Sequence, residues 1–344
     1  MFNAKTVFVL GAGSSGEVGL PIAGELAEKI AALLEIRFDG SRQASGDVLI
    51  MDAYRKTDAA HANEYRAAGC AIKSGIPLAN SIDSYLDSHR DNAKINLCGK
   101  LGIVKAISEA ERASLLFLEA SRRDGPITAQ NISNTWFIKF FRILSERISK
   151  RELERPFENV AFINFNYDRC LEHFLVYAVR DKYGLDWSTA YAAIKKLVVY
   201  HPYGSIGDLQ WQTVRQPTPF GIELEHPDTL LNMADRIRTF TEKVSDAARI
   251  AELRNVVADA RNVVFLGFAY HPQNLELLKA QAVMTPKRIY GTVKGVSGPD
   301  QSVIDEALRR MVGAPTVNLV QEMNLHNGTC STLFDTYSRS LTQA

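Results

Sequence analysis

The chain has 344 residues, a formal net charge of +1, 46% hydrophobic residues and 23% charged residues. This composition is that of an ordinary globular protein and excludes an overall electrostatic bias toward nucleic acid. The sequence also lacks the roughly 20 consecutive apolar residues of a membrane span. We therefore expect no direct nucleic-acid binding and no membrane association. The length allows one large α/β domain with an insertion, or two domains.

The N-terminus carries no signal-peptide pattern, which favours a cytoplasmic location. The four cysteines are widely spaced and form no Cys-x-x-Cys pair, the unit from which structural zinc sites are usually built. We therefore expect no metal cofactor.

The first predicted element is a short apolar strand at residues 7–10, which runs into a glycine-rich segment at residues 11–16. A helix should follow, because Pro21 suits a helix start and apolar residues recur with helical spacing at Leu26, Ile30, Leu33 and Leu34. Strand, glycine turn and helix together form an opening typical of nucleotide-binding domains.

Residues 36–155 lack clear strand runs and show helical periodicity, for example at residues 113–118 and 136–141. We interpret them as a helical insertion within a single domain that spans residues 1–344. Residues 39–46 and 205–219 are rich in Gly, Ser, Gln and Pro, and we predict that both are surface loops.

Apolar strands resume after the insertion and alternate with segments of helical length, such as residues 230–244 and 246–260. The predicted strands are residues 160–165, 197–200, 263–266, 289–293 and 317–320. Such alternation implies a mainly parallel sheet with right-handed crossovers. The predicted fold class is α/β, with a Rossmann-like, mainly parallel sheet and a helical insertion or subdomain.

The glycine-rich segment is the first candidate for binding chemistry. A dinucleotide pyrophosphate must approach the backbone closely, which side chains would prevent, and helix N-terminal amides favour its negative charge. A tight strand-to-helix connection is the alternative reason for Gly11 and Gly13. The segment continues into Gly19, Leu20 and Pro21, which an ordinary dehydrogenase fingerprint does not require.

The second candidate segment, residues 162–168, ends a buried strand, where an open α/β sheet places its ligand site. An uncharged amide such as that of Asn166 can orient a hydroxyl or a water without adding charge beside a departing cationic base. The alternative is that Asn166 and Asp168 cap the helix predicted after them, and the two roles can coexist.

The third candidate segment, residues 200–207, follows another apolar strand. His201 titrates near neutral pH and can accept a proton from a ribose hydroxyl or a water. Strand alternation would point Tyr203 the same way, so Tyr203 is the alternative occupant of this position. A later strand ends at Gly267, and we interpret His271 beyond it as a residue at a helix start.

Taken in order, these segments resemble a sirtuin-type domain, and more closely the sirtuin-like NAD hydrolases of prokaryotic antiphage defence. The resemblance lies in Gly11–Pro21, in the Asn-Tyr-Asp of residues 166–168, and in the segment that holds His201 and Gly204. Residues 81–86 resemble an acidic helical segment of the same effectors, although an amphipathic helix end accounts for that pattern as well. Two departures count against peptide deacylation: no four-cysteine zinc module lies between His201 and Gly267, and Gly-Leu-Pro does not continue into Asp-Phe-Arg.

The resemblance implies that NAD is bound as a substrate and that its nicotinamide–ribose bond is cleaved to give nicotinamide and ADP-ribose. The catalytic residues that it implies are Asn166 and His201. The residues implied to bind NAD are Gly11, Ala12, Gly13, Ser14, Ser15, Gly19, Pro21, Asp168 and Gly267. The alternatives are a module that binds NAD or ADP-ribose without turnover, a zinc-less deacylase and, last, a dehydrogenase.

The resemblance also implies a role as an antiphage effector that depletes NAD, which must be held inactive in the healthy host. Because the chain ends soon after its last predicted strand, we expect control by self-assembly into a homo-oligomer or by a regulatory protein partner, such as an ATPase or a nucleic-acid-guided protein. The sequence leaves open the oligomeric state, the activator, NAD against NADP, and a linear against a cyclic product.

Overall fold

The computed structural model describes the whole chain except residues 128–131, 240–241, 243–246, 281–284, 314–318 and 344. The described part contains a six-stranded sheet in which every neighbouring pair of strands is parallel. Its strands are β1 (Thr6–Leu10), β4 (Val160–Asn164), β5 (Val198–Tyr200), β6 (Asn262–Leu266), β7 (Lys287–Thr292) and β8 (Val320–His326).

The strand order is β5-β4-β1-β6-β7-β8. This is the order of a Rossmann fold, in which the direction of winding reverses at the first strand. The predicted α/β, Rossmann-like class is therefore confirmed. The reversal lies between β1 and β6, and a crevice for a ligand is expected beyond the carboxyl ends of these strands.

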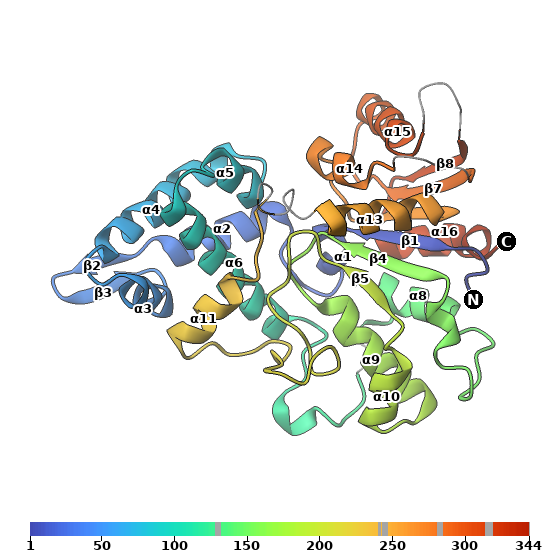
Figure 1. The fold of residues 1–344 in the computed structure, drawn as a ribbon, viewed down its shortest axis with the longest axis horizontal. Helices are drawn as coiled ribbons and strands as arrows, with labels where there is room; N and C mark the ends of the chain where they lie inside the picture. Colours follow the sequence, from blue (N-terminus) through green and yellow to red (C-terminus); the bar gives the residue numbers. More distant parts are fainter. Residues whose placement is uncertain (128–131, 240–241, 243–246, 281–284, 314–318, 344) are drawn as a thin grey trace.

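Helices cover both faces of the sheet (Figure 1). Strand β1 shows why, since all five of its residues are buried and alternate ones enter opposite cores. Val7 and Val9 belong to the core that holds α13 (Ala247–Asp259), α14 (Pro272–Leu278) and α15 (Gly298–Val312). Phe8 and Leu10 belong to the other core. The helices of that core are α8 (Trp136–Leu144), α9 (Cys170–Tyr183), α10 (Trp187–Ala193) and α16 (Cys330–Thr342).

A lobe of helices, called here the helical lobe, extends from one side of the sheet and occupies the left of Figure 1. It consists of α2 (Ala23–Leu34), α3 (Val48–Thr57), α4 (Ala62–Gly75), α5 (Ile82–Ser88), α6 (Ala93–Ala113) and α11 (Pro227–Ala234). Three of its helices, α3, α5 and α6, begin at side-chain caps of the usual kind. Asp47 Oδ1 accepts from Ile50 N at the start of α3, and Asn92 Oδ1 accepts from Ile95 N at the start of α6.

The helical lobe differs in extent from the helical insertion predicted at residues 36–155. Helices α2 and α11 come from outside that range and pack against α4, α6 and α3. Helix α8 lies inside the range but packs against α16, beneath the sheet. The described part also contains the short helix α1 (Ala12–Gly16) and three 3-10 helices: η1 (Ile76–Leu78), η2 (Ala120–Arg122) and η3 (Arg155–Phe157).

Two segments differ from their predicted structure. Residues 39–46, predicted as a loop, belong largely to a hairpin of β2 (Arg37–Asp39) and β3 (Arg42–Ser45), with Gly40 at φ +60° in its turn. The helical pattern at residues 113–118 stops at Ala113, because Ser114 N turns back to Glu111 O and Leu115 N bonds to Val18 O.

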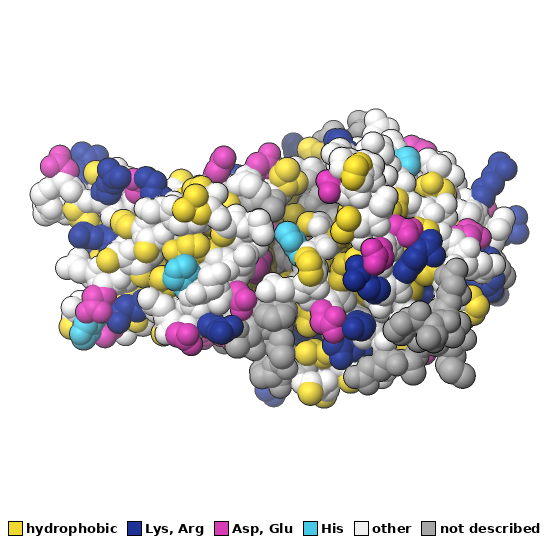
Figure 2. Space-filling model, turned by 90° about the horizontal axis from the view of Figure 1, so that it is seen from above, with side chains coloured by type: hydrophobic (Ala, Val, Ile, Leu, Met, Phe, Trp, Pro, Cys, Tyr) yellow, Lys and Arg dark blue, Asp and Glu magenta, His cyan; other side chains and the backbone are white. Residues whose placement is uncertain are grey.

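The last predicted strand and one predicted helix are displaced. The strand predicted at residues 317–320 is observed as β8, and residues 317–318 lie outside the described part. The helix predicted at residues 230–244 is observed as α11, while residues 240–241 and 243–244 lie outside the described part. Among the described helices, none combines the length and the apolar character needed to cross a membrane. On the face seen in Figure 2, basic and acidic side chains are interspersed.

Candidate functional site

A cavity of about 320 Å³ lies beyond the carboxyl ends of β1, β4 and β6, where the helical lobe meets the sheet. The glycine segment after β1 supplies Gly11 and Ala12, and residues 165–168 come from the end of β4. Residues 268–274, apart from 270, come from the end of β6, and residues 80–84 come from the start of α5. The cavity therefore occupies the position that the strand order predicts for a ligand.

The glycine segment is shaped by its contact with the end of β6. Gly11 N donates to Leu266 O and Gly13 N donates to Gly267 O, both at 3.0 Å. A Cβ on Gly11 would lie 2.5 Å from Gly267 O, and one on Gly13 would lie 2.8 Å from Gly267 Cα. The close approach of the two backbones thus requires glycine at these positions. A tight strand-to-helix connection, the alternative to pyrophosphate binding, is therefore enough to account for Gly11 and Gly13. The backbone N–H groups of both residues therefore donate to carbonyls of the protein itself.

Asn166 joins β4 to the glycine segment and lines the cavity. Its Nδ2 donates to Gly11 O at 3.0 Å and to Ser15 Oγ at 3.2 Å, and the residue is 9% exposed. Asn166 Oδ1 accepts no hydrogen bond from any of the described residues. The side chain therefore keeps an acceptor for a ligand while its amide nitrogen is fixed by the protein.

Asp168 is buried at the same wall, and its Oδ1 accepts from Cys170 N at 3.0 Å, at the start of α9. Capping and cavity lining thus coexist at this residue. Burial raises the pKa of Asp168 to about 6, with a further upward contribution from the nearby charge of Glu111, and hydrogen bonds from Cys170 and Ser15 oppose the shift. A carboxyl with such a pKa exchanges its proton near neutral pH.

His201 lies outside the cavity lining, with both ring nitrogens held by the protein. Nε2 is 2.6 Å from Glu172 Oε1, and Nδ1 is 3.1 Å from Asn166 O. Burial lowers the pKa of His201, but the charge and hydrogen bond of Glu172, the Asn166 carbonyl and the charge of Asp168 together raise that pKa by more. A doubly held imidazole has no ring nitrogen left for a substrate in this arrangement.

Tyr203 lines the cavity where His201 does not, and its hydroxyl donates to Asn274 Oδ1 at 2.7 Å. The expectation from strand alternation fails here because β5 ends at Tyr200. The following residues form a turn, in which Gly204 N donates to His201 O and Gly204 has φ +75°. The structure thus favours Tyr203 as the residue of this segment that faces a ligand.

The other predicted NAD-binding residues divide into two groups. Ala12 and Pro21 line the cavity together with Gly11, Asn166 and Asp168. The remaining ones support the wall from behind or lie apart from it, and they are Gly13, Ser14, Ser15, Gly19 and Gly267. Gly267, at φ +57°, packs against the backbone of Gly13 and Ser14.

Several lining residues lie outside the predicted set. Tyr167 donates its hydroxyl to the carboxylate of Asp83, which joins the end of β4 to α5. The acidic segment at residues 81–86 is the sequence signal for Asp83. His271, which the sequence marks as a residue at a helix start, does precede α14 as its N-cap residue, but it also lines the cavity. No motif in the sequence marks Asn274 as a site residue.

A scan against protein-family models and a search of curated proteins give no match to this chain. Within the described residues, no three His, Cys, Asp or Glu side chains are grouped so that they could hold a metal ion.

Proposed function

We propose that the chain is an NAD hydrolase that cleaves the bond between nicotinamide and ribose. The observation that carries this proposal is the pairing of an amide, Asn166, with a carboxyl of raised pKa, Asp168, in a cavity at the switch point of a Rossmann sheet. Dinucleotides bind to such sheets at this point. The order of the three motifs, which resembles that of sirtuin-like NAD hydrolases, supports the same reaction.

The charge of the cavity indicates which half of NAD it would hold. Asp83 and Asp168 line it, and none of the described lining residues is Lys or Arg. An acidic lining favours the cationic nicotinamide ring over the anionic pyrophosphate. The volume of about 320 Å³ is at the low end of ligand pockets, which span about 300–1,000 Å³, and suits half of a dinucleotide.

The proposed reaction consumes one water. The C–N bond breaks as nicotinamide leaves with the bonding electron pair and becomes neutral, and C1′ of the ribose becomes an oxocarbenium-like centre. Water forms the new C–O bond, and its proton passes to the Asp168 carboxylate and then to solvent. Asn166 Oδ1 would accept a hydrogen bond from that water or from a ribose hydroxyl, which fixes the direction of attack. The products are nicotinamide, ADP-ribose and a proton.

His201 has a positioning role in this proposal. Its Nδ1 contacts the carbonyl of Asn166, and Glu172 holds the ring from the other side. The proton acceptor is therefore Asp168, and Tyr203 lies on the cavity side as a hydrogen-bonding residue.

The proposed biological role, depletion of NAD during phage infection, rests on the resemblance alone. The same holds for a cytoplasmic location, for assembly into a homo-oligomer and for a regulatory partner such as an ATPase or a nucleic-acid-guided protein.

The test is incubation of the purified full chain with NAD, with nicotinamide and ADP-ribose followed by chromatography. We expect equal amounts of both products from the unchanged chain. Asn166→Ala and Asp168→Asn should each lower the rate at least about a hundredfold, the usual minimum for a group that acts on a proton or water in the transition state. Asn255→Ala is the matched control, because Asn255 is exposed on α13, away from the cavity.

A non-catalytic module that binds NAD or ADP-ribose is the second candidate, and the engagement of both His201 nitrogens favours it. Calorimetric binding of NAD without release of nicotinamide would support this candidate against the hydrolase. Absence of both binding and release would contradict both.

A further inference from the structure

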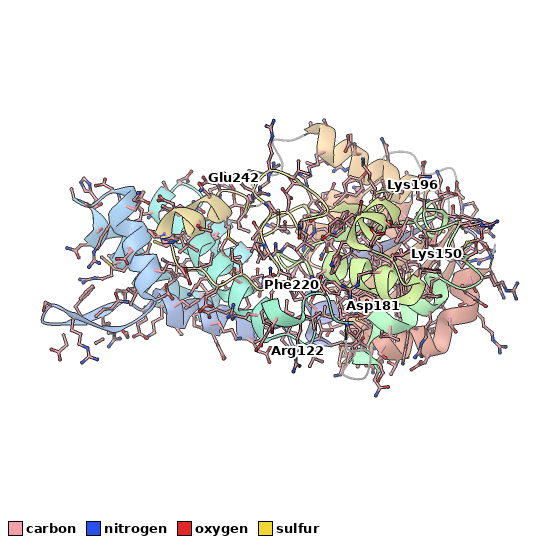
Figure 3. All side chains as sticks on the ribbon, turned by 90° about the horizontal axis from the view of Figure 1, so that it is seen from below. Arg122, Lys150, Asp181, Lys196, Phe220 and Glu242 are labelled. Atoms are coloured by element: carbon pink, nitrogen blue, oxygen red, sulfur yellow. The ribbon has the colours of Figure 1, made fainter. Side chains whose placement is uncertain are left out.

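A second cavity, of about 440 Å³, lies between α9, α10 and the loop of residues 205–219. Helices α9 and α10 are at the bottom of Figure 1, so this side of the molecule faces the viewer in Figure 3, which labels Phe220. The cavity shares no lining residue with the first one. Six aromatic rings line it, those of His173, Tyr177, Trp187, Tyr191, Trp211 and Phe220.

Contacts among the rings and with α9 hold much of this wall in place. The rings of His173 and Phe220 are stacked, with centroids 4.0 Å apart and planes at 9°. Tyr177 meets Trp187 edge-on at 4.9 Å, and the Arg180 guanidinium lies 4.2 Å from the Trp187 ring centroid. Rings fixed in this way can accept a flat ligand without first losing much side-chain entropy.

The polar atoms of the wall include an acceptor on His173. Nε2 of this residue lies 3.1 Å from Leu116 O, so Nε2 carries the hydrogen. Burial lowers the pKa of His173 to about 3, which keeps the ring neutral at physiological pH. Nδ1 is then an acceptor without a hydrogen-bond partner among the described residues, on a ring that lines the cavity.

Trp211 supplies an unused donor. Its Nε1 is buried and has no hydrogen-bond partner within the described part of the chain. Because this atom is closed to solvent, the Trp211 ring must turn before its N–H can reach a ligand in the cavity. A buried N–H without an acceptor is costly, and a ligand that offers an acceptor removes that cost. The two charged residues of the lining, Arg123 and Asp124, are exposed and of opposite sign, so the cavity has no net charge.

We propose that this second cavity binds an uncharged, planar nitrogen heterocycle of the nucleobase class, stacked among the aromatic rings and hydrogen-bonded to Trp211 Nε1 and His173 Nδ1. Such a ring carries acceptors and donors on one edge and an apolar face on each side.

Intrinsic tryptophan fluorescence tests the proposal directly. The chain has three tryptophans, and two of them, Trp187 and Trp211, line this cavity. The third, Trp136, is fully buried with its indole bonded to Ser14 O. Titration of the full chain with adenosine, guanosine, cytidine, uridine and nicotinamide should give a saturable change with at least one of them.

Variants assign the change to the second cavity. Trp211→Phe keeps a ring but removes the N–H, and should weaken binding about fivefold to tenfold, the usual effect of one hydrogen bond. Tyr191→Leu should also weaken it, whereas Tyr183→Leu, on a ring outside the lining, should not. Asn166→Ala, which changes the first cavity, should leave the titrations with the four nucleosides unaltered.

Several results would overturn the proposal. One is the absence of any saturable change with all five compounds at millimolar concentration. Another is nucleoside binding that Asn166→Ala abolishes and Trp211→Phe leaves intact. Saturation by a disaccharide or a proline-rich peptide, with none by the five heterocycles, would assign the cavity to another class of ligand.

Discussion

Asp168 is only 3% exposed, and the burial that raises its pKa to about 6 also makes its charged form costly to the fold. In the unfolded chain the same group has a pKa of about 3.9. Because the folded pKa is higher, folding stability is lost as the pH rises between these values, and the loss is complete above the folded pKa. At neutral pH the cost is about 3 kcal/mol.

Asp168→Asn should therefore stabilise the protein at neutral pH. The asparagine oxygen can still accept from Cys170 N, but no charge is buried. We expect the free energy of unfolding to rise by about 2–3 kcal/mol near pH 7.5 and hardly to change near pH 4. Urea denaturation at several pH values measures this difference.

Asp186→Asn is the control for Asp168→Asn, because its effect on the free energy of unfolding at neutral pH should have the opposite sign. Asp186 is exposed at the N-cap of α10, where the hydrogen bond from Thr189 N lowers its pKa. Its contribution to stability is present above the unfolded pKa and lost as the pH falls, so the asparagine variant should be slightly less stable at neutral pH. A gain at Asp168→Asn that does not depend on pH would contradict the assigned cause.

The site residues differ in how well the sequence predicts their positions. The place of Asn166 and Asp168 beside the cavity could be predicted because an open α/β sheet binds its ligand beyond the carboxyl ends of its strands. The position of His201 could not, because it depends on Glu172, which reaches the ring from α9, and on a turn that interrupts the strand pattern after Tyr200. Neither feature has a local signal in residues 200–207.

At the scale of elements, the carboxylate of Glu17 accepts hydrogen bonds at the N-termini of two helices. Glu17 Oε2 accepts from Trp136 N at 2.8 Å, at the first residue of α8, and Glu17 Oε1 accepts from Ser331 N at 2.7 Å, in the first turn of α16. Each bond satisfies a backbone N–H that has no partner within its helix, and the negative charge suits both helix dipoles.

Glu17→Ala should remove both caps and lower the free energy of unfolding by about 2–3 kcal/mol, since one cap contributes about 0.5–2 kcal/mol. Glu25→Ala is the matched control, because Glu25 accepts one bond from Ile22 N at the exposed start of α2. That variant should lose no more than about 1 kcal/mol. Thermal and urea unfolding of both variants measure the comparison, and equal losses would contradict the double cap.

The strands could be predicted at this scale because a short, continuous apolar run between turn signals is typical of a strand buried on both faces. The extent of the helical lobe could not, because α11 joins α3 and α6 from a distant part of the sequence. The wall that residues 80–84 give to the first cavity depends on the same tertiary packing, which periodicity does not report.

At the scale of the whole molecule, a buried ion pair joins the helical lobe to the sheet. Glu111 on α6 is 0% exposed and Arg169, just before α9, is 1% exposed. Arg169 Nε donates to Glu111 Oε1 at 3.1 Å, and its other nitrogens reach Thr218 O and Pro219 O. The pair thus fixes α6, α9 and the loop that lines the second cavity at one point.

Arg169→Met should lower the free energy of unfolding by about 3–5 kcal/mol, because it leaves the Glu111 carboxylate buried without its partner. The double variant Arg169→Met with Glu111→Leu should recover much of that loss. A double-mutant cycle from urea denaturation measures the coupling. The exposed pair Arg236–Asp208 is the control and should couple by less than about 1 kcal/mol. A small loss at Arg169→Met alone would contradict the linking role.

The contact between the glycine segment and β6 has a consequence for the time at which the first cavity forms. Gly11 and Gly13 are translated early, but the carbonyls that hold them belong to Leu266 and Gly267, which leave the ribosome much later. A nascent chain that ends before β6 cannot give residues 11–13 their final geometry, whatever else has folded. If this cavity cleaves NAD, the cell that makes the protein is protected from unfinished copies by the order of synthesis alone.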